Sequence, residues 1–224
     1  MDDAMIIKDV NKSYGHGVGR VHVLKDVSFS AALGELNLVL GPSGSGKSTF
    51  LTIAGGLQTP DTGQVIIDGQ DINKLSHQQK EHLRLDKIGF VLQSYNLLPY
   101  LTVQDQFKLV DRVKKAGNLS AGQLDQLLEQ LEIKKLVNQY PSELSGGQNQ
   151  RVAIARALYT DPQVVLADEP TASLDSNLVK VVGQLFQDLA KQNNKAVVVV
   201  THDLRLKQFA DRIWDLSDGK LTQE

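Results

Sequence analysis

Residues 41–49 read GPSGSGKST, and this stretch decides the fold. It matches the pattern G-x-x-x-x-G-K-S, whose glycines let successive backbone N–H groups turn inward and cradle a phosphate chain at a helix start. The apolar run Leu36–Leu40 leads into it, and the helical pattern of Phe50–Leu57 follows. A chance glycine-rich loop is the alternative, and the order strand, loop, helix argues against it. The stretch therefore predicts a nucleotide-binding loop.

The side chains of this loop suit a magnesium nucleotide. We expect the Lys47 ammonium to neutralise the β- and γ-phosphates and the Ser48 hydroxyl to bind Mg²⁺. ATP and Mg²⁺ are thus the predicted cofactors. The nucleotide ligands expected from the loop are Gly41, Ser43, Gly44, Ser45, Gly46, Lys47, Ser48 and Thr49.

A second apolar strand, predicted over residues 163–168, ends in the adjacent carboxylates Asp168 and Glu169. Residues at the carboxyl end of such a strand lie at the sheet edge beside a phosphate loop. There Asp168 would bind Mg²⁺ and Glu169 would polarise the attacking water. Asp-Glu standing alone would favour a solvated acidic turn, but beside the phosphate loop the catalytic interpretation is favoured.

Three kinds of pattern divide the chain. The first third alternates short β-branched runs with turn signals, which predicts antiparallel strands. The middle third has apolar residues at helical spacing, and the last third alternates apolar strands with helices, which predicts a parallel sheet buried on both faces. The expected strands are Met5–Val10, Val21–Phe29, Gln64–Asp68, Ala196–Thr201 and Arg212–Leu216, and the expected helices are Thr102–Ala116, Ser120–Leu131, Gly146–Leu158, Ser176–Lys191 and Arg205–Ala210.

Composition argues against several classes of protein. The 224 residues contain 24 Lys and Arg against 26 Asp and Glu, so no basic excess supports binding to nucleic acid. No run reaches the roughly 18 apolar residues of a membrane span, and the acidic first residues are unlike a secretory signal. We therefore expect a cytoplasmic chain. The absence of cysteine excludes disulfides and zinc–thiolate sites.

Residues 144–148 read LSGGQ and precede the helix predicted from Gly146. Ser145, Gly146, Gly147 and Gln148 would present a second set of free N–H groups at a helix start, where they could meet phosphate. Considered alone, the loop is better explained as an ordinary helix N-cap. The chain has only one phosphate loop, so a second phosphate-binding segment would need a nucleotide from elsewhere to bind.

The chain resembles the ABC ATPase family, and the resemblance covers essentially its whole length. It rests on six segments that occur in the family's order: residues 41–48, Gln93, residues 144–148, residues 164–169, residues 173–175 and His202. Asn149 departs from the charged or longer residues common after the LSGGQ loop. The resemblance implies an α/β fold, with a RecA-like P-loop NTPase core, an antiparallel β-subdomain and a helical subdomain. Residues 1–224 would form one domain, with residues 94–159 as the helical subdomain and approximately 1–93 and 160–224 as the rest.

The resemblance also implies how two copies would work together. The LSGGQ loop of one copy would close on the nucleotide held by its partner, so that two ATP molecules lie between two chains. Gln93 would sense Mg²⁺ and water as a catalytic and metal-binding residue, and His202 would contact the γ-phosphate. Asp175 would bridge the copies, and Tyr14 would stack on adenine. A strand-end aromatic that packs on its own sheet remains the alternative for Tyr14.

Further segments resemble one subgroup, the ATPases that serve macrolide, antimicrobial-peptide and lipoprotein exporters. Residues 55–57 and 88–100 carry this likeness. Residues 83–86, 99–103 and 201–206 resemble the ATPases of bacterial haem exporters in particular. The resemblance implies an ATPase that is peripheral on the cytoplasmic face of the membrane and drives export through a separate permease. The segments that resemble haem exporters make haem the candidate cargo.

Two other assignments stay open. The ATPase could serve an antimicrobial-peptide, lipoprotein or cell-division complex of the same family, and deletion would then give a division defect in the last case. Alternatively it could be an ABC ATPase that acts on ribosomes or in DNA repair. Such proteins carry two fused units or a long coiled-coil insertion, so 224 residues with one phosphate loop argue against them.

Overall fold

The computed structural model describes residues 3–224, except for the side chain of Val18. Within these residues the larger of two β-sheets has six strands. Their order is β10-β9-β3-β8-β7-β6, and all pairs are parallel except β9 with β10. The strands are β3 (Leu36–Leu40), β6 (Ile88–Val91), β7 (Val164–Asp168), β8 (Ala196–Thr201), β9 (Arg212–Ser217) and β10 (Lys220–Gln223). Every residue of β3, β7 and β8 is buried, which confirms the predicted parallel sheet covered on both faces.

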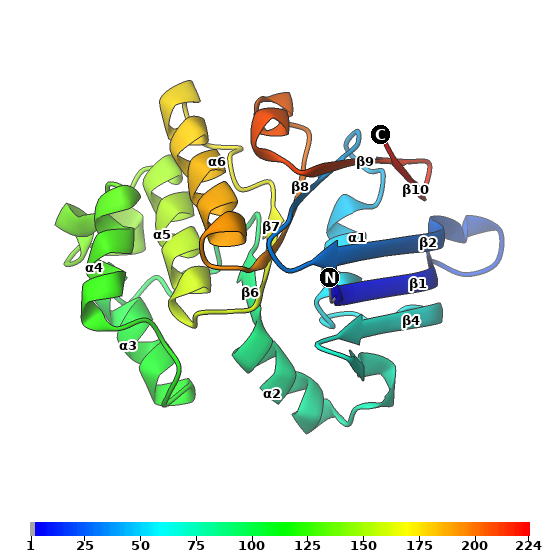
Figure 1. Cartoon of the computed structure of the whole chain (residues 1–224), viewed down its shortest axis with the longest axis horizontal. Coiled ribbons are helices and arrows are strands. Elements are labelled where there is room, and N and C mark those ends of the chain that lie inside the picture. The colour runs from blue at the N-terminus through cyan, green and yellow to red at the C-terminus, as the bar shows by residue number, and fades with distance from the viewer. Residues whose placement is uncertain (1–2) are drawn as a thin grey trace.

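The smaller sheet is antiparallel and has four strands in the order β2-β1-β4-β5. They are β1 (Asp3–Tyr14), β2 (Val21–Ala32), β4 (Thr62–Ile67) and β5 (Gln70–Asp71). Both β1 and β2 extend beyond their predicted ends because each continues to pair with the other through irregular register. This sheet lies at one end of the molecule, away from α3 and α4 (Figure 1).

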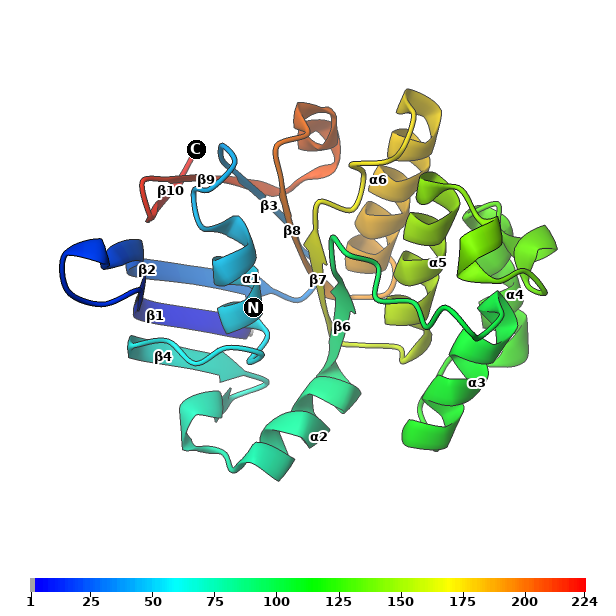
Figure 2. The same cartoon turned by 180° about the vertical axis from the view of Figure 1, so that it is seen from behind.

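Within residues 3–224, six α-helices complete the architecture. They are α1 (Lys47–Ala54), α2 (His77–Lys87), α3 (Val103–Val113), α4 (Ala121–Gln130), α5 (Gly146–Tyr159) and α6 (Ser176–Lys191). Serine residues precede α2, α4 and α5 as N-caps in capping boxes, and Ser120 is the N-cap of α4. None of the helices in residues 3–224 is long and apolar enough to cross a bilayer. Figure 2 shows α1 beside the antiparallel strands, and α5 and α6 between the parallel sheet and α3 and α4.

Alternate residues of the parallel strands enter two different cores. Leu38 of β3 faces the cluster formed with α3–α6, whereas its neighbour Val39 faces the cluster formed with α1 and the antiparallel sheet. Successive side chains of a strand point to opposite faces, so a fully apolar strand can serve both cores. The parallel sheet therefore packs on one face against α1, which follows the phosphate loop, and on the other face against α3–α6.

The structure differs from the sequence-based prediction in several elements. Residues 205–210 were expected to form an α-helix, but Leu204–Phe209 form a 3₁₀ helix, whose N-cap Asp203 accepts a hydrogen bond from the Arg205 N–H. Helix α2 and the strands β5, β6 and β10 were not predicted. The helices α3, α4 and α5 do lie within residues 94–159, while the proposed subdomain boundaries stay a prediction.

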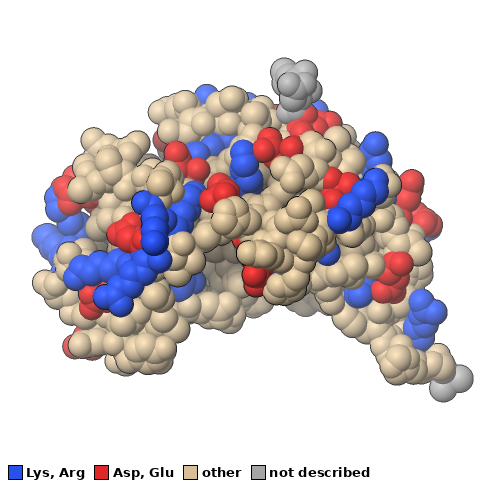
Figure 3. Space-filling view, turned by 90° about the horizontal axis from the view of Figure 1, so that it is seen from below, with Lys and Arg blue, Asp and Glu red and all other residues tan. Residues whose placement is uncertain are grey.

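Lys and Arg side chains gather over the end of the molecule that holds α3 and α4, and both signs of charge are mixed elsewhere on this face (Figure 3). Several of the cations near these helices are paired with acidic neighbours. Lys108 contacts Asp105, and Lys134 contacts Asp125 and Glu129. Such exposed pairs contribute little to stability.

Candidate functional site

The phosphate loop runs between β3 and α1, and its backbone conformation depends on glycine. Gly46 is the N-cap of α1 and has a φ of 104°. A Cβ on Gly46 would lie 3.0 Å from the Val23 carbonyl oxygen, and one on Gly41 would lie 2.3 Å from the Leu216 carbonyl oxygen. Both the left-handed backbone and the close approach exclude larger residues. The glycines therefore leave backbone N–H groups uncovered at the helix start.

The Lys47 ammonium lies inside the site, although the residue is only 7% exposed. Its Nζ donates hydrogen bonds to the carbonyl oxygens of Gly41 (2.8 Å) and Pro42 (2.9 Å). The same atom lies 3.8 Å from Glu169 Oε1. A buried cation is tolerated only when it has such acceptors. The geometry keeps one positive charge at the phosphate loop.

A cavity of about 360 Å³ brings together residues from distant parts of the chain. Val23 and Ala172 line it without having been predicted, because apolar residues carry no chemical signal in the sequence. Gly41 and Ser45 of the predicted set are not in its lining. The residues that line it are Val23, Ser43, Gly44, Gly46, Lys47, Ser48, Thr49, Gln93, Asp168, Glu169, Ala172 and His202.

Asp168 ends β7 and is 6% exposed. Its Oδ1 has no hydrogen-bond partner among the described residues. Burial raises the pKa of Asp168 above its usual value, and the nearby Glu169 charge adds to this, whereas the Ser48 hydroxyl beside it acts in the opposite direction. A buried carboxylate oxygen without a partner next to a hydroxyl is a donor set that fits a hard cation such as Mg²⁺.

The described residues hold no cluster of three or more His, Asp or Glu that could bind a metal ion by protein ligands alone. Mg²⁺ usually takes one or two protein oxygens and completes its shell with water and phosphate. Ser48 and Asp168 could thus supply the protein oxygens for a cation that arrives with a nucleotide.

The Glu169 carboxylate is held from the neighbouring strand β8. Thr201 Oγ1 donates to Oε2 at 2.7 Å, and the His202 backbone N–H donates to the same oxygen at 3.3 Å. His202 Nδ1 lies 3.0 Å from Oε1. Here the His202 ring contacts Glu169, and its predicted contact with a γ-phosphate stays a prediction. The two carboxylates lie at the edge of the sheet where the sequence placed them.

Gln93 follows β6 and enters the cavity from a strained loop. Tyr95 and Asn96 both have positive φ values, 52° and 51°. Arg156 of α5 donates to their carbonyl oxygens, at 3.0 Å for Tyr95 and 2.5 Å for Asn96. The position of the Gln93 loop therefore depends on the helix that follows the LSGGQ loop.

The LSGGQ loop lies outside the cavity lining and is organised as a helix cap. Ser145 Oγ accepts from the Gln148 N–H at 3.3 Å, and Gln148 Oε1 accepts from the Ser145 N–H at 2.8 Å. Ser145 and Gly146 are exposed. The Asn149 side-chain amide donates to the carbonyl oxygens of Pro141 (3.0 Å) and Leu144 (3.2 Å), so this departure from the family pattern ties the loop to the preceding 3₁₀ turn.

Tyr14 and Asp175 also lie outside the cavity lining. Tyr14 ends β1, is 41% exposed and donates through its hydroxyl to Gln58 Oε1 at 2.8 Å. Its ring is therefore anchored at one end and accessible on its surface. Asp175 caps α6 by accepting from the N–H groups of Asn177 (2.9 Å) and Leu178 (3.0 Å). This capping role is compatible with a second role between two copies.

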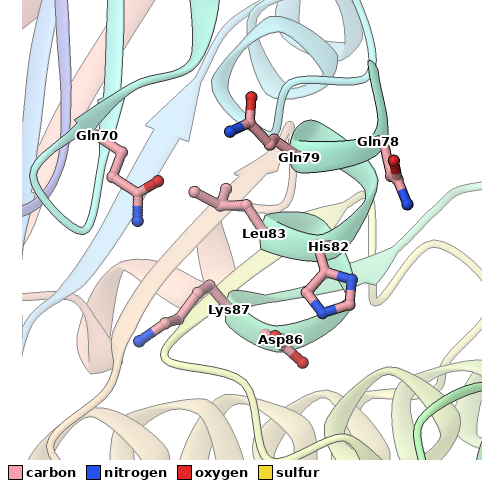
Figure 4. A pocket seen from close by; sticks show the side chains of 7 residues that line it. All are labelled: Gln70, Gln78, Gln79, His82, Leu83, Asp86 and Lys87. Carbon is pink, nitrogen blue, oxygen red and sulfur yellow. The ribbon is translucent and has the colours of Figure 1, made fainter. Parts of the chain in front are cut away.

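A second cavity of about 440 Å³ lies beside α2 and shares no residue with the site above. Leu83 and Lys87 point toward Gln70 of the antiparallel sheet, while Gln78 and His82 point to another side of the helix (Figure 4). The lining consists of Gln70, Gln78, Gln79, His82, Leu83, Asp86 and Lys87. No predicted site residue belongs to it.

Comparison with known proteins agrees with the geometry. Residues 24–172 match the family model described as "ABC transporter". A protein of Staphylococcus epidermidis named "Putative hemin import ATP-binding protein HrtA" is 43% identical over 220 residues, which cover 97% of this chain and 98% of that protein. The Staphylococcus aureus protein of the same name is 40% identical over 222 residues, which cover 98% and 99%.

Two solved structures share the fold. One is titled "Dimeric Structure of MJ0796, a Bacterial ABC Transporter Cassette", with a TM-score of 0.91 and 41% identity over 98% of this chain and 97% of that one. The other is a post-hydrolysis state of the same cassette bound to ADP and Pi, with a TM-score of 0.89, 41% identity and the same coverage. Because the family model matches more than half of this chain, the chain belongs to the ABC transporter family as an ATP-binding subunit.

Proposed function

We propose that two copies of this chain close over two Mg·ATP molecules, hydrolyse them and thereby drive haem export through a separate permease, on whose cytoplasmic side they sit. The observation that carries the hydrolytic part is the meeting of the phosphate loop, Gln93, Asp168, Glu169 and His202 around one cavity. These residues come from segments far apart in the sequence, and phosphate transfer to water needs each of their chemistries.

Each residue has a distinct part in this reaction. Lys47 and the N–H groups of the loop bind and orient the phosphates. Ser48 and Asp168 would hold Mg²⁺, which supplies positive charge to the phosphate oxygens. Glu169 orients the water and accepts its hydrogen bond, while Thr201 and His202 hold the carboxylate in place. Gln93 approaches the same space from β6.

The exposed LSGGQ loop supports the paired arrangement. Within one copy, Ser145, Gly146, Gly147 and Gln148 lie outside the cavity that would hold the phosphates. A second copy can bring an equivalent loop to that cavity, and helix starts bind anions well. The related cassette is described as dimeric, and one of its structures contains ADP and Pi. Asp175 would lie between the copies in this arrangement.

Haem is proposed as cargo because the relatives at 40–43% identity are named for hemin. Their printed names say import, whereas the segments that resemble exporter ATPases favour export. No residue of the cavity is suited to select a cargo, since the cavity is built around phosphate chemistry. The cargo and its direction therefore have to be measured with the permease present.

The cargo test uses the chain together with the membrane protein that co-purifies with it, reconstituted in vesicles. We expect haem to stimulate ATP hydrolysis several-fold and to move from the side that carries this subunit to the opposite side. Iron-free protoporphyrin and a cationic peptide serve as comparison cargoes, and a Lys47→Met complex shows whether movement needs ATP. Movement toward the ATPase side would overturn export. Stimulation of ATP hydrolysis by the peptide alone would favour a peptide exporter over a haem exporter. Co-purification of this chain with division proteins would favour a cell-division complex.

The adenine site gives a sharper test on this chain alone. We expect Tyr14→Ala to weaken ATP binding by about tenfold, since stacking of a base on an aromatic side chain is worth about 1–3 kcal/mol. Tyr14→Phe should bind within about threefold of the natural protein, because the ring stays while the bond to Gln58 is lost. Titration with a fluorescent ATP analogue gives both constants. Equal affinity of the Tyr14→Ala variant would contradict the adenine role.

A further inference from the structure

The side-chain amide of Gln150 is buried, and both its nitrogen and its oxygen form hydrogen bonds. It lies in α5, five residues after Ser145, and is 2% exposed. Its Nε2 donates to the Glu169 backbone carbonyl oxygen at 2.8 Å, and its Oε1 accepts from the Ser173 N–H at 3.1 Å. Burying an amide side chain requires such partners, and here both belong to the turn that carries the carboxylate of the site.

That turn has an unfavourable backbone conformation. Glu169 has a φ of 48°, which residues with a Cβ rarely adopt. Its N–H donates to the Val200 carbonyl oxygen at 2.9 Å, and its own carbonyl oxygen also accepts from the Ala172 N–H at 3.2 Å. Strained backbone at a functional site persists only where several contacts hold it. The Gln150 amide is the contact through which α5 reaches the Glu169 backbone.

Helix α5 touches the same turn a second time, through its first residues. A Cβ on Gly147 would lie 2.9 Å from the Ser173 carbonyl oxygen, so the helix start sits directly on the turn. The Ser173 hydroxyl is 2.9 Å from the Tyr95 hydroxyl, and Arg156 holds the Tyr95 carbonyl oxygen. One helix thus contacts both the Glu169 turn and the loop that follows Gln93.

We propose that Gln150 is a positioning residue for ATP hydrolysis, which ties α5 to the backbone of Glu169 so that the carboxylate points at the attacking water only when α5 is in place. The inference rests on the proposed function, in which the LSGGQ loop at the start of α5 meets the partner's nucleotide. Closure on one nucleotide is then transmitted through Gln150 to the Glu169 that acts on the other nucleotide.

The test compares three variants of the full chain. Gln150→Met removes both bonds at nearly unchanged volume. Gln150→Glu keeps an acceptor for Ser173 but replaces the donor to Glu169 by an oxygen, and it serves if Gln150→Met does not fold. The matched control is Gln106→Met, because Gln106 is another buried amide, whose Nε2 donates to the Leu98 carbonyl oxygen (2.8 Å) and which does not line the cavity.

We expect both Gln150 variants to lower kcat by about tenfold or more, with KM for ATP changed by less than about threefold. The Hill coefficient for ATP should fall toward one, because the two sites lose their link. Gln106→Met should keep kcat within about twofold at a similar loss of thermal stability. In a Glu169→Gln background, Gln150→Met should lower the residual rate no further, because both changes remove the same function.

A Gln150 variant with normal kcat overturns the inference, and so does a loss of kcat that Gln106→Met reproduces. The outcome is separable from that of the proposed function through Glu169→Gln. If the unmodified chain hydrolyses ATP at a measurable rate and Glu169→Gln abolishes it, the proposed hydrolysis at this site is supported. The result for Gln150 then concerns only its positioning role. If the natural chain hydrolyses no ATP, or Glu169→Gln turns over normally, the proposed function and the inference both fall.

Discussion

Replacing Glu169 by glutamine is expected to lower kcat for ATP by at least about a hundredfold, which is the lower range for loss of general-base catalysis. The amide has the size of the carboxylate, so the bond from Thr201 and the phosphate loop are kept. An amide, however, cannot draw the proton of the attacking water. ATP binding should therefore persist while hydrolysis stops.

Persistent binding without hydrolysis should trap the closed pair. We expect the Glu169→Gln variant to elute as a dimer in size-exclusion chromatography with Mg·ATP, and as a monomer with Mg·ADP. Glu129→Gln is a suitable control, because Glu129 pairs with Lys134 in an exposed contact on α4. A variant that binds nucleotide, stays monomeric and hydrolyses ATP at the normal rate would contradict the role of Glu169.

Replacing Lys47 by methionine should weaken ATP binding by about a hundredfold. A hydrogen bond to a charged group contributes roughly 1.5–3 kcal/mol, and the lysine would make such bonds to two phosphates. Methionine fills the same buried space, so the loop should fold while losing its cation. Turnover should be lost with binding, in contrast to the Glu169 variant.

Calorimetric titration with ATP in the presence of Mg²⁺ gives the affinity directly. Lys114→Met is the matched control, since Lys114 also donates to a backbone carbonyl oxygen, that of Thr160 at 2.7 Å, in a partly buried place outside the cavity. It should bind ATP with unchanged affinity. Unchanged affinity in Lys47→Met would mean that the phosphates lie elsewhere.

Local sequence was enough for the elements with strong patterns. Leu36–Leu40 is fully apolar and forms β3 with the predicted bounds, and Ser176–Lys191 forms α6 as predicted. By contrast, α2 has Leu83 as its only buried residue among the described side chains, so no apolar period marks it. Strand β6 has four residues, too few for a pattern, and exists because it pairs with β7.

Local sequence was likewise enough for one part of the candidate site. The sequence determined the phosphate loop, because its glycine conformations and the following helix are set by neighbouring residues. It also placed Asp168 and Glu169, because an apolar strand fixes where its first polar residues emerge.

Only the tertiary structure decided which distant groups meet these residues. Strand β8 lies beside β7, and this pairing brings Thr201 and His202 to the Glu169 carboxylate. Packing of α5 on the turn after β7 brings Gln150 to the Glu169 backbone. Contacts between segments remote in the chain depend on strand order and helix packing. No local pattern encodes them, because the free energy that selects them comes from burying both cores at once.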